Sequence, residues 1–445
     1  MGRAVGIEVR KVSLWDLLRL QWFVSLPGFF QGLVAPNRGF LSWRCRHGAG
    51  RSTVLFFRKL REKYRCEHLW VWFPLRRTLL VFAPETIEAV LSSDANAADP
   101  FLKKRALSRF VPEALVISSG DEWRDRRRFN EAALDTGKLH RHHDAFLEIA
   151  AAEAERLTGE GRDELRWPDF QTLGQRISHQ VILGMHHVRP ELAAQLERMV
   201  RLSNLTLRDR ASFAGFYEAI ERYLTRKESM ATACLMNDSA TAREAADASK
   251  VTSVPTQIGF WFFVLKDAVE LHVARTLALI AAHSDVQARV REEIFRAGAL
   301  TAQAIDSLAY LEACIAEQLR LWTPVPILLR RAVTSFSLRG EIPLEAEAQI
   351  LIHTGFYHRD PGVFGARANG FSPDAARDGA PNLYVFSAHR QSCAGRSLIT
   401  FVLKATLASL LRRARFELSG PAIEPGRIPY LYDHFEVRLR KVSDA

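Results

Sequence analysis

Apolar residues recur along most of the chain at spacings typical of helices. From residue 256 to residue 294 the pattern predicts one long helix, and residues 140–250 are rich in helical pattern with polar interruptions. A further helix is predicted to stop at Pro324, because proline cannot continue a helix. Strand-like patterns over residues 69–73 and 78–82 predict part of a small sheet. The pattern as a whole predicts a mainly α fold with a minor β region.

The N-terminal part of the chain has a different pattern. Residues 12–35 are strongly apolar, but polar residues such as Asp16 and Arg19 interrupt them, and a spanning helix needs about 20 mostly uninterrupted apolar residues. Basic and aromatic flanks fit an amphipathic segment on a membrane surface. A segment folded onto the protein's own surface is the alternative, and a signal peptide or anchor is a third. We therefore divide the chain into an N-terminal segment, 1–52, and one large domain, 53–445.

Composition and charge narrow the class of protein. The 445 residues are 48% hydrophobic and 25% charged, as in ordinary globular proteins. The formal net charge of +11 favours acidic partners or an anionic membrane surface, and no basic-aromatic motif for nucleic acid is visible. The five cysteines are odd in number and widely spaced, which argues against a disulfide framework and a zinc site. They favour a reducing compartment, so we expect a cytoplasmic protein. Peripheral attachment to a membrane is the alternative.

The residues that best indicate a chemical function lie in the segment 384–396, which precedes an apolar run. Phe386 lies seven residues before Cys393, and Gly395 lies two residues after it. This arrangement resembles the haem-binding loop of the cytochrome P-450 superfamily, whose pattern is F-x-x-G-x-R-x-C-x-G. The resemblance implies that Cys393 is the axial thiolate ligand of a haem b iron, because a thiolate pushes electron density onto the iron and favours O–O cleavage. It also implies that Phe386 shields the sulfur.

The loop departs from the family pattern at two positions. His389 stands where the family has glycine, and Gln391 stands where it has arginine or histidine, with Arg390 shifted by one. Glycine there usually serves a positive φ or a close backbone approach, so His389 implies a remodelled loop or a residue held in a costly conformation. Gln391 cannot neutralise a haem propionate. On these residues alone, a structural Cys393 at a loop–helix junction is the alternative.

Two more segments support the resemblance. Glu317 and Arg320 stand at i, i+3 on the helix before Pro324, like the E-x-x-R pair of the superfamily, and residues 356–364 resemble its H-R-D-P-x-x-F segment. The order matches, with about 70 residues between Arg320 and the cysteine. In the family a further arginine contacts this Glu–Arg pair. This chain has no arginine at the matching position, and Arg377 takes that role only if the motif is shifted along the sequence.

Three other side chains would bind the haem propionates. Trp123 and Arg127 match the W-x-x-x-R helix of the family, and Arg330 matches a propionate contact on the strand predicted over 328–333. Surplus arginines beside Trp123 are either a solvated helix face or a docking surface for an acidic ferredoxin or a flavoprotein reductase. No flavin or iron–sulfur module is fused, so the donor is expected to be separate.

The long central helix should carry the proton relay of the family. Counting back from its expected end places Val264 to Ala268 where the family has A/G-G-x-D/E-T. Asp267 keeps the acid, but Ala268 replaces the alcohol that helps to deliver protons. The alternative for Lys266 and Asp267 is an exposed turn of the helix.

The resemblance implies a monooxygenase that hydroxylates or otherwise oxidises a hydrophobic small molecule. The aromatic residues at 260–263 suggest a hydrophobic pocket. Ala268 favours a second class, a peroxide-using peroxygenase or a lipid hydroperoxide isomerase or dehydratase of the same fold. His389 and Gln391 favour a third, a haem-binding relative without catalysis.

Overall fold

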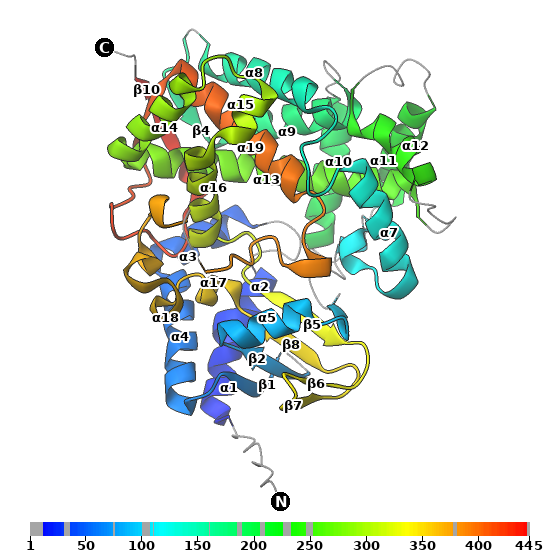
Figure 1. The fold of residues 1–445 in the computed structure, drawn as a ribbon, viewed down its shortest axis with the longest axis vertical. Helices are drawn as coiled ribbons and strands as arrows, with labels where there is room; N and C mark the ends of the chain where they lie inside the picture. The colour runs from blue at the N-terminus through cyan, green and yellow to red at the C-terminus, as the bar shows by residue number, and fades with distance from the viewer. Residues whose placement is uncertain are drawn as a thin grey trace, which may run out of the picture.

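The structure is a computed structural model that describes residues 12–30, 36–73, 76–99, 107–109, 111–159, 161–184, 189–204, 210–225, 233–245, 252–376 and 381–442. Arg377, the shifted candidate partner of Glu317, lies outside these residues. Figure 1 shows a large helical part above a smaller part in which the N-terminal helices flank a sheet. The fold is mainly α with a minor β region, as the sequence predicts.

The helices of the larger part gather around α13 (Val254–Ala282). Helix α9 (Trp167–Leu183) packs along α13 so closely that a Cβ on Gly174 would lie 2.8 Å from the Lys266 carbonyl oxygen, and only glycine permits this approach. The other helices of this part are α7 (Gly120–Ala133), α8 (His143–Thr158), α10 (Pro190–Asn204), α11 (Arg210–Leu224), α12 (Leu235–Ala245), α14 (Ser284–Arg296), α15 (Ala302–Ser307), α16 (Ala309–Leu321) and α19 (Arg396–Arg413).

The predicted long helix over residues 256–294 is wrong at one position. Helix α13 ends at Ala282 and α14 begins at Ser284, because His283 has an extended backbone with φ −125° and ψ 90°. The His283 Nδ1–H donates to the Leu279 carbonyl at 2.8 Å, and Ser284 and Asp285 open the next helix with residues that favour a helix N-terminus. Periodicity alone does not reveal such a break, because the apolar pattern continues across it.

The strands form three sheets. The largest has the order β1-β2-β8-β5-β3, with β2 and β8 parallel and the other neighbours antiparallel; the others are β4-β10-β9 and β6-β7. The strand bounds are β1 (His68–Trp72), β2 (Arg77–Val81), β3 (Asn96–Ala98), β4 (Glu164–Arg166), β5 (Leu328–Ala332), β6 (Phe336–Leu338), β7 (Ile342–Leu344), β8 (Gln349–Ile352), β9 (Arg415–Gly420) and β10 (Arg438–Val442). The predicted strands at 69–73, 78–82 and 328–333 are present within one residue.

Short helices complete the sheet part and the connections. The α-helices are α3 (Arg38–Arg46), α4 (Ala49–Tyr64), α5 (Pro84–Ser92), α17 (Thr354–Tyr357) and α18 (Pro361–Phe364), and the 3-10 turns are η2 (Leu115–Ile117), η4 (Gly365–Asn369), η5 (Asp374–Ala376), η6 (His389–Gln391) and η7 (His434–Glu436). The expected boundary at 52/53 therefore falls inside α4.

The Glu317–Arg320 pair lies in the interior of the protein. Each side chain is 1% exposed, and Arg320 Nε and Nη2 each donate to a Glu317 carboxylate oxygen at 2.7 Å. The same guanidinium donates to backbone carbonyls of the segment after β8, including those of His358 at 2.9 Å and Gly370 at 2.9 Å. Removal of one partner from such a buried pair costs about 3–5 kcal/mol. The pair therefore fastens α16 to the chain that leads to the cysteine loop.

The N-terminal segment folds onto the sheet part and keeps one apolar face outward. It forms α1 (Leu14–Leu20), the π-helical turn η1 (Gln21–Ser25) and α2 (Leu26–Phe30). Leu20 and Val24 are buried in a cluster with residues of α4 and β8, whereas other large side chains are at least 40% exposed: Leu14, Trp15, Leu18, Trp22, Leu26 and Phe30. None of the described helices is long and apolar enough to span a bilayer. The segment thus both packs on the protein's own surface and presents an apolar face.

Candidate functional site

Cys393 lies on the loop that enters the helical part just before α19. The orange segment before α19 crosses between the two parts of the molecule (Figure 1). The Cys393 N–H donates to the Phe386 carbonyl at 2.8 Å, which closes the loop, and α19 begins three residues later at Arg396. The sulfur therefore lies near the positive end of an 18-residue helix, where a negative charge is favoured.

The Cys393 side chain is accessible although protein surrounds it. Burial raises the pKa of the Cys393 thiol, whereas a hydrogen bond from the Gly395 N–H and the charges of Arg127 and Arg396 lower it. Phe386 packs against the main core nearby, and the Arg396 guanidinium lies 5.7 Å from the centre of its ring.

The expected cost at His389 is present in the backbone. His389 has φ +52° and Ser387 has φ +58°, so two residues with side chains occupy the left-handed region within one loop. His389 pairs through Nε2 with Glu88 on α5, and Tyr384 Oη donates to the same carboxylate at 2.9 Å. Gln391 Nε2 donates to the Asn96 carbonyl at 3.0 Å. The loop is therefore remodelled around these contacts.

Arg330 is a buried cation without a counter-ion. It is 4% exposed, its Nη1 donates to the Leu329 carbonyl and its Nη2 to Ser387 Oγ at 2.7 Å, and its Nε has no partner. Among the described residues no carboxylate lies within ion-pair distance of it, and burial lowers its pKa to about 10. Such a group is costly to bury alone, so this position suits an anionic ligand group.

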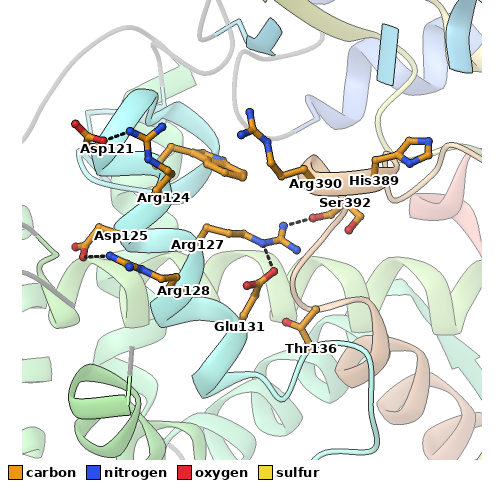
Figure 2. Close-up of a pocket in the computed structure, with 11 residues that line it drawn as sticks. Asp121, Arg124, Asp125, Arg127, Arg128, Glu131, Thr136, His389, Arg390 and Ser392 are labelled. Atoms are coloured by element: carbon orange, nitrogen blue, oxygen red, sulfur yellow. Dashed lines mark hydrogen bonds and ion pairs between the residues drawn. The ribbon is translucent and has the colours of Figure 1, made fainter. Parts of the chain in front are cut away.

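A cleft of about 800 Å³ lies between α7 and the cysteine loop (Figure 2). Arg127 points across it, donating from Nη1 to the Ser392 carbonyl and from Nε to Glu131 at 2.6 Å. The Arg390 guanidinium lies 5.2 Å from the centre of the Trp123 ring. These side chains come together at the loop, as the motifs predict, whereas the His389 ring meets Glu88 instead.

The exposed arginines of α7 have partners on their own helix. Arg124 pairs with Asp121, and Arg128 Nη2 lies 3.8 Å from Asp125 Oδ1. The positive charge of this face is therefore smaller than the arginine count indicates. Arg390 beside the loop is itself paired with Asp94 at 3.2 Å, so any docking surface depends more on the exposed Arg396.

The middle of α13 presents one accessible face within a buried helix. Residues 260, 264, 268, 271 and 275 are partly or fully accessible at spacings of a single helix face, and Val264 is 37% exposed. Ala268 therefore lies on the accessible face of α13. Since Ala268 has no hydroxyl, this face lacks the alcohol that the family motif contains.

Asp267 lies at the edge of this face beside a buried cation. The Asp267 side chain is 39% accessible, and burial raises its pKa. Lys266 Nζ lies 3.8 Å from Asp267 Oδ1 and donates to Glu270 Oε2 at 3.0 Å. Burial raises the pKa of both carboxyl groups, and the contacts with Lys266 act in the opposite direction. The sequence analysis named Lys266 and Asp267 as candidates on this helix but did not name Glu270. The i, i+4 spacing of Glu270 from Lys266 was the signal that could have found it.

The residues of the site suit a haem. The accessible sulfur, the positive groups around it and the uncompensated buried Arg330 match the thiolate ligand and the anionic propionates of that group. Ser387 was not found from the sequence, because its contact with Arg330 joins residues 57 positions apart. Gly395 has φ −88°, so its backbone does not require glycine.

Comparisons with known proteins agree with this geometry. The cytochrome P-450 family model matches residues 269–427. Cytochrome P-450 72A11 of Arabidopsis thaliana is 23% identical over 396 residues, which cover 79% of this chain and 76% of that protein. Cytochrome P-450 4c3 of Drosophila melanogaster is 25% identical over 415 residues, covering 78% and 76%. Cytochrome P-450 714C2 of Oryza sativa subsp. japonica is 31% identical over 191 residues, covering 38% and 36%.

Arg330→Met should separate haem binding from stability. We expect faster loss of haem to a competing apoprotein, because a propionate loses its buried partner, while the melting temperature of the haem-free protein stays equal or rises, because an uncompensated cation is removed. Arg331→Met is the matched control, since Arg331 is the next residue on β5 and pairs with the exposed Glu347. Equal haem retention in the Arg330 variant and wild type would refute the assignment.

Proposed function

Since the chain belongs to the cytochrome P-450 superfamily of haem-iron monooxygenases, we propose that it oxidises a hydrophobic small molecule at a haem b held by Cys393. The observation that carries this proposal is the accessible Cys393 side chain, with Arg127, Arg396 and the Gly395 N–H beside it, at the start of α19. Haem, when bound, supplies the redox centre at which dioxygen is reduced and one of its oxygen atoms is transferred to substrate.

The chain's own residues would hold the cofactor in three ways. The N-terminus of α19, the Gly395 N–H and two arginines, 127 and 396, favour the thiolate form of Cys393. Phe386, whose carbonyl accepts from the Cys393 N–H, would shield the sulfur. Arg330, together with Arg127, Trp123 and Arg390 at the cleft, would bind the propionates.

Proton supply is the unusual part of this site. The reduction of dioxygen consumes protons, and a hydroxyl next to the acid would normally hold the water that carries them. Here Asp267 must hold that water without help from residue 268, unless a substrate hydroxyl replaces it. This observation favours a second candidate function, oxidation with peroxide, because peroxide brings its own protons and electrons.

Electrons for the monooxygenase reaction would come from a separate acidic donor, a ferredoxin or a flavoprotein reductase. The net charge of +11 and the exposed Arg396 beside the cysteine loop favour such a partner. Acidic ferredoxins and flavoprotein reductases would be tested as donors. If the protein turned over with peroxide but with none of these donors, this part of the proposal would be contradicted.

Ala268→Thr should improve the coupling of electrons to product. With an acidic ferredoxin and its reductase, we expect the wild type to waste a large share of its electrons as peroxide on substrates without a hydroxyl, and to show peroxide-driven activity. Ala268→Thr should raise the product formed per electron severalfold, whereas Ala268→Val, which has the same shape without the hydroxyl, should not.

The ratio of product to electrons consumed is the measurement. Equal coupling in the Thr and Val variants, or tight coupling in the wild type together with no peroxide activity, would mean that another residue carries the relay.

We also propose that the N-terminal segment rests on an anionic membrane surface, with the protein in the cytoplasm. Its outward apolar side chains include Trp15 and Trp22, residues that suit the membrane interface, and Arg19 stacks on Trp15 with 5.6 Å between guanidinium and ring centre. Together with Phe30, Phe40 and Trp43, Trp22 lines an apolar groove of about 360 Å³.

Vesicle sedimentation tests this contact. We expect the full chain to bind vesicles that contain phosphatidylserine, binding to weaken as salt rises, and Trp15→Ser with Trp22→Ser to reduce binding roughly tenfold or more. Phe295→Ser is the control, since Phe295 is a similarly exposed aromatic on α14. Binding that is unchanged in the double variant would mean that this face does not touch lipid.

A further inference from the structure

We propose that residues 88–96 form a brace that positions the Cys393 loop, with Glu88 as its central positioning residue. The inference rests on the proposed function, because the loop has this role only if Cys393 holds the haem. The segment comprises the end of α5 and the start of β3, and neither element belongs to the haem-binding motif.

Three consecutive loop residues bond to this one segment. His389 Nε2 bonds to Glu88 Oε1, and Arg390 Nε pairs with Asp94 Oδ1 at 3.2 Å. Gln391 Nε2 donates to the Asn96 carbonyl at 3.0 Å. Two of them, His389 and Gln391, stand at the positions where the loop departs from the family pattern, and Arg390 lies between them. Both side chains that break the motif therefore bond within the same nine residues of chain, 88–96.

The brace is also connected to the loop through the sheet, by way of β3 and β5. Asn96 opens β3, which pairs antiparallel with β5, so Ala98 lies opposite Arg330. Arg330 Nη2 then donates to Ser387 Oγ in the loop at 2.7 Å. The contacts form a ring from the loop to α5 and β3, across to β5, and back to the loop. Such a ring fixes the sulfur ligand and the buried propionate-binding cation relative to each other.

Glu88 is the central residue because its carboxylate accepts from two loop residues. Tyr384 Oη donates to Oε2 at 2.9 Å and His389 meets Oε1. Burial raises the pKa of Glu88, but the hydrogen bonds from Tyr384 and His389 outweigh it and leave that pKa low. His389 at φ +52° adopts a conformation that disfavours a side chain, and its bond to Glu88 offsets that cost. With glycine at 389 the offset would not be needed.

Hydrogen exchange on the haem-free full chain tests the brace without the cofactor. Glu88→Gln should speed exchange of amides in residues 384–395 by roughly fivefold, because one charged hydrogen-bonded contact is weakened. Glu85→Gln is the matched control: Glu85 is exposed one turn earlier on α5, and among the described contacts it has none to the loop. Unchanged exchange in Glu88→Gln would overturn the proposal.

A double-mutant cycle on the haem-loaded protein tests positioning. We expect Glu88→Gln to shift the midpoint potential of the haem and to reduce the share of the red-shifted Soret band in the reduced carbon monoxide complex. His389→Gly should reduce this sensitivity, so that Glu88→Gln has a smaller effect on both quantities in that background, where only the Tyr384 contact remains. Equal effects of Glu88→Gln in both backgrounds would show that Glu88 acts elsewhere and would refute the brace.

Failure of the proposed function gives a different result. A wild-type protein without the red-shifted band would refute haem–thiolate binding, whatever the exchange data show. A normal wild-type band with no effect of Glu88→Gln on potential or spectrum would refute the brace alone.

Discussion

A thiol enclosed by protein favours its neutral form, and the surroundings of Cys393 are arranged against that tendency. Burial raises the pKa of the thiol, whereas the Gly395 N–H, Arg127, Arg396 and the start of α19 all favour the anion. A metal at the sulfur would complete the charge balance that these groups begin. The enclosed, uncompensated Arg330 poses the opposite problem at the same loop, since it lacks an anion. One group that carries both a cationic centre and carboxylates satisfies both sites.

The loop meets these demands without the glycine of the family motif. Two residues in the left-handed region, Ser387 and His389, each make a side-chain contact outside the loop, with Arg330 and Glu88 respectively. Conformational cost in the backbone is thus offset by bonds to two different elements, β5 and α5. The buried Glu317–Arg320 pair holds the segment that leads into the loop, so the whole approach to Cys393 is anchored on both sides.

The sequence predicted those features that local pattern or spacing determines. The mainly α fold and the small sheet follow from periodicity, and the Glu317–Arg320 pair follows from the resemblance to the E-x-x-R motif of the family. The break at His283 was missed because the apolar pattern runs through it, and the N-terminal segment proved to be both packed and exposed. The contacts of Glu88 with His389 and of Arg330 with Ser387 were not predictable, since they join residues 301 and 57 positions apart and depend on the tertiary fold.

The reduced carbon monoxide spectrum of Cys393→Ser tests the central claim most directly. Because the thiolate defines the electronics of the iron, the red-shifted Soret band of the wild-type complex should disappear in this variant, while Cys66→Ser, on a half-buried cysteine outside the loop, keeps it. A Cys393→Ser protein with the same red-shifted band as the wild type would contradict the account.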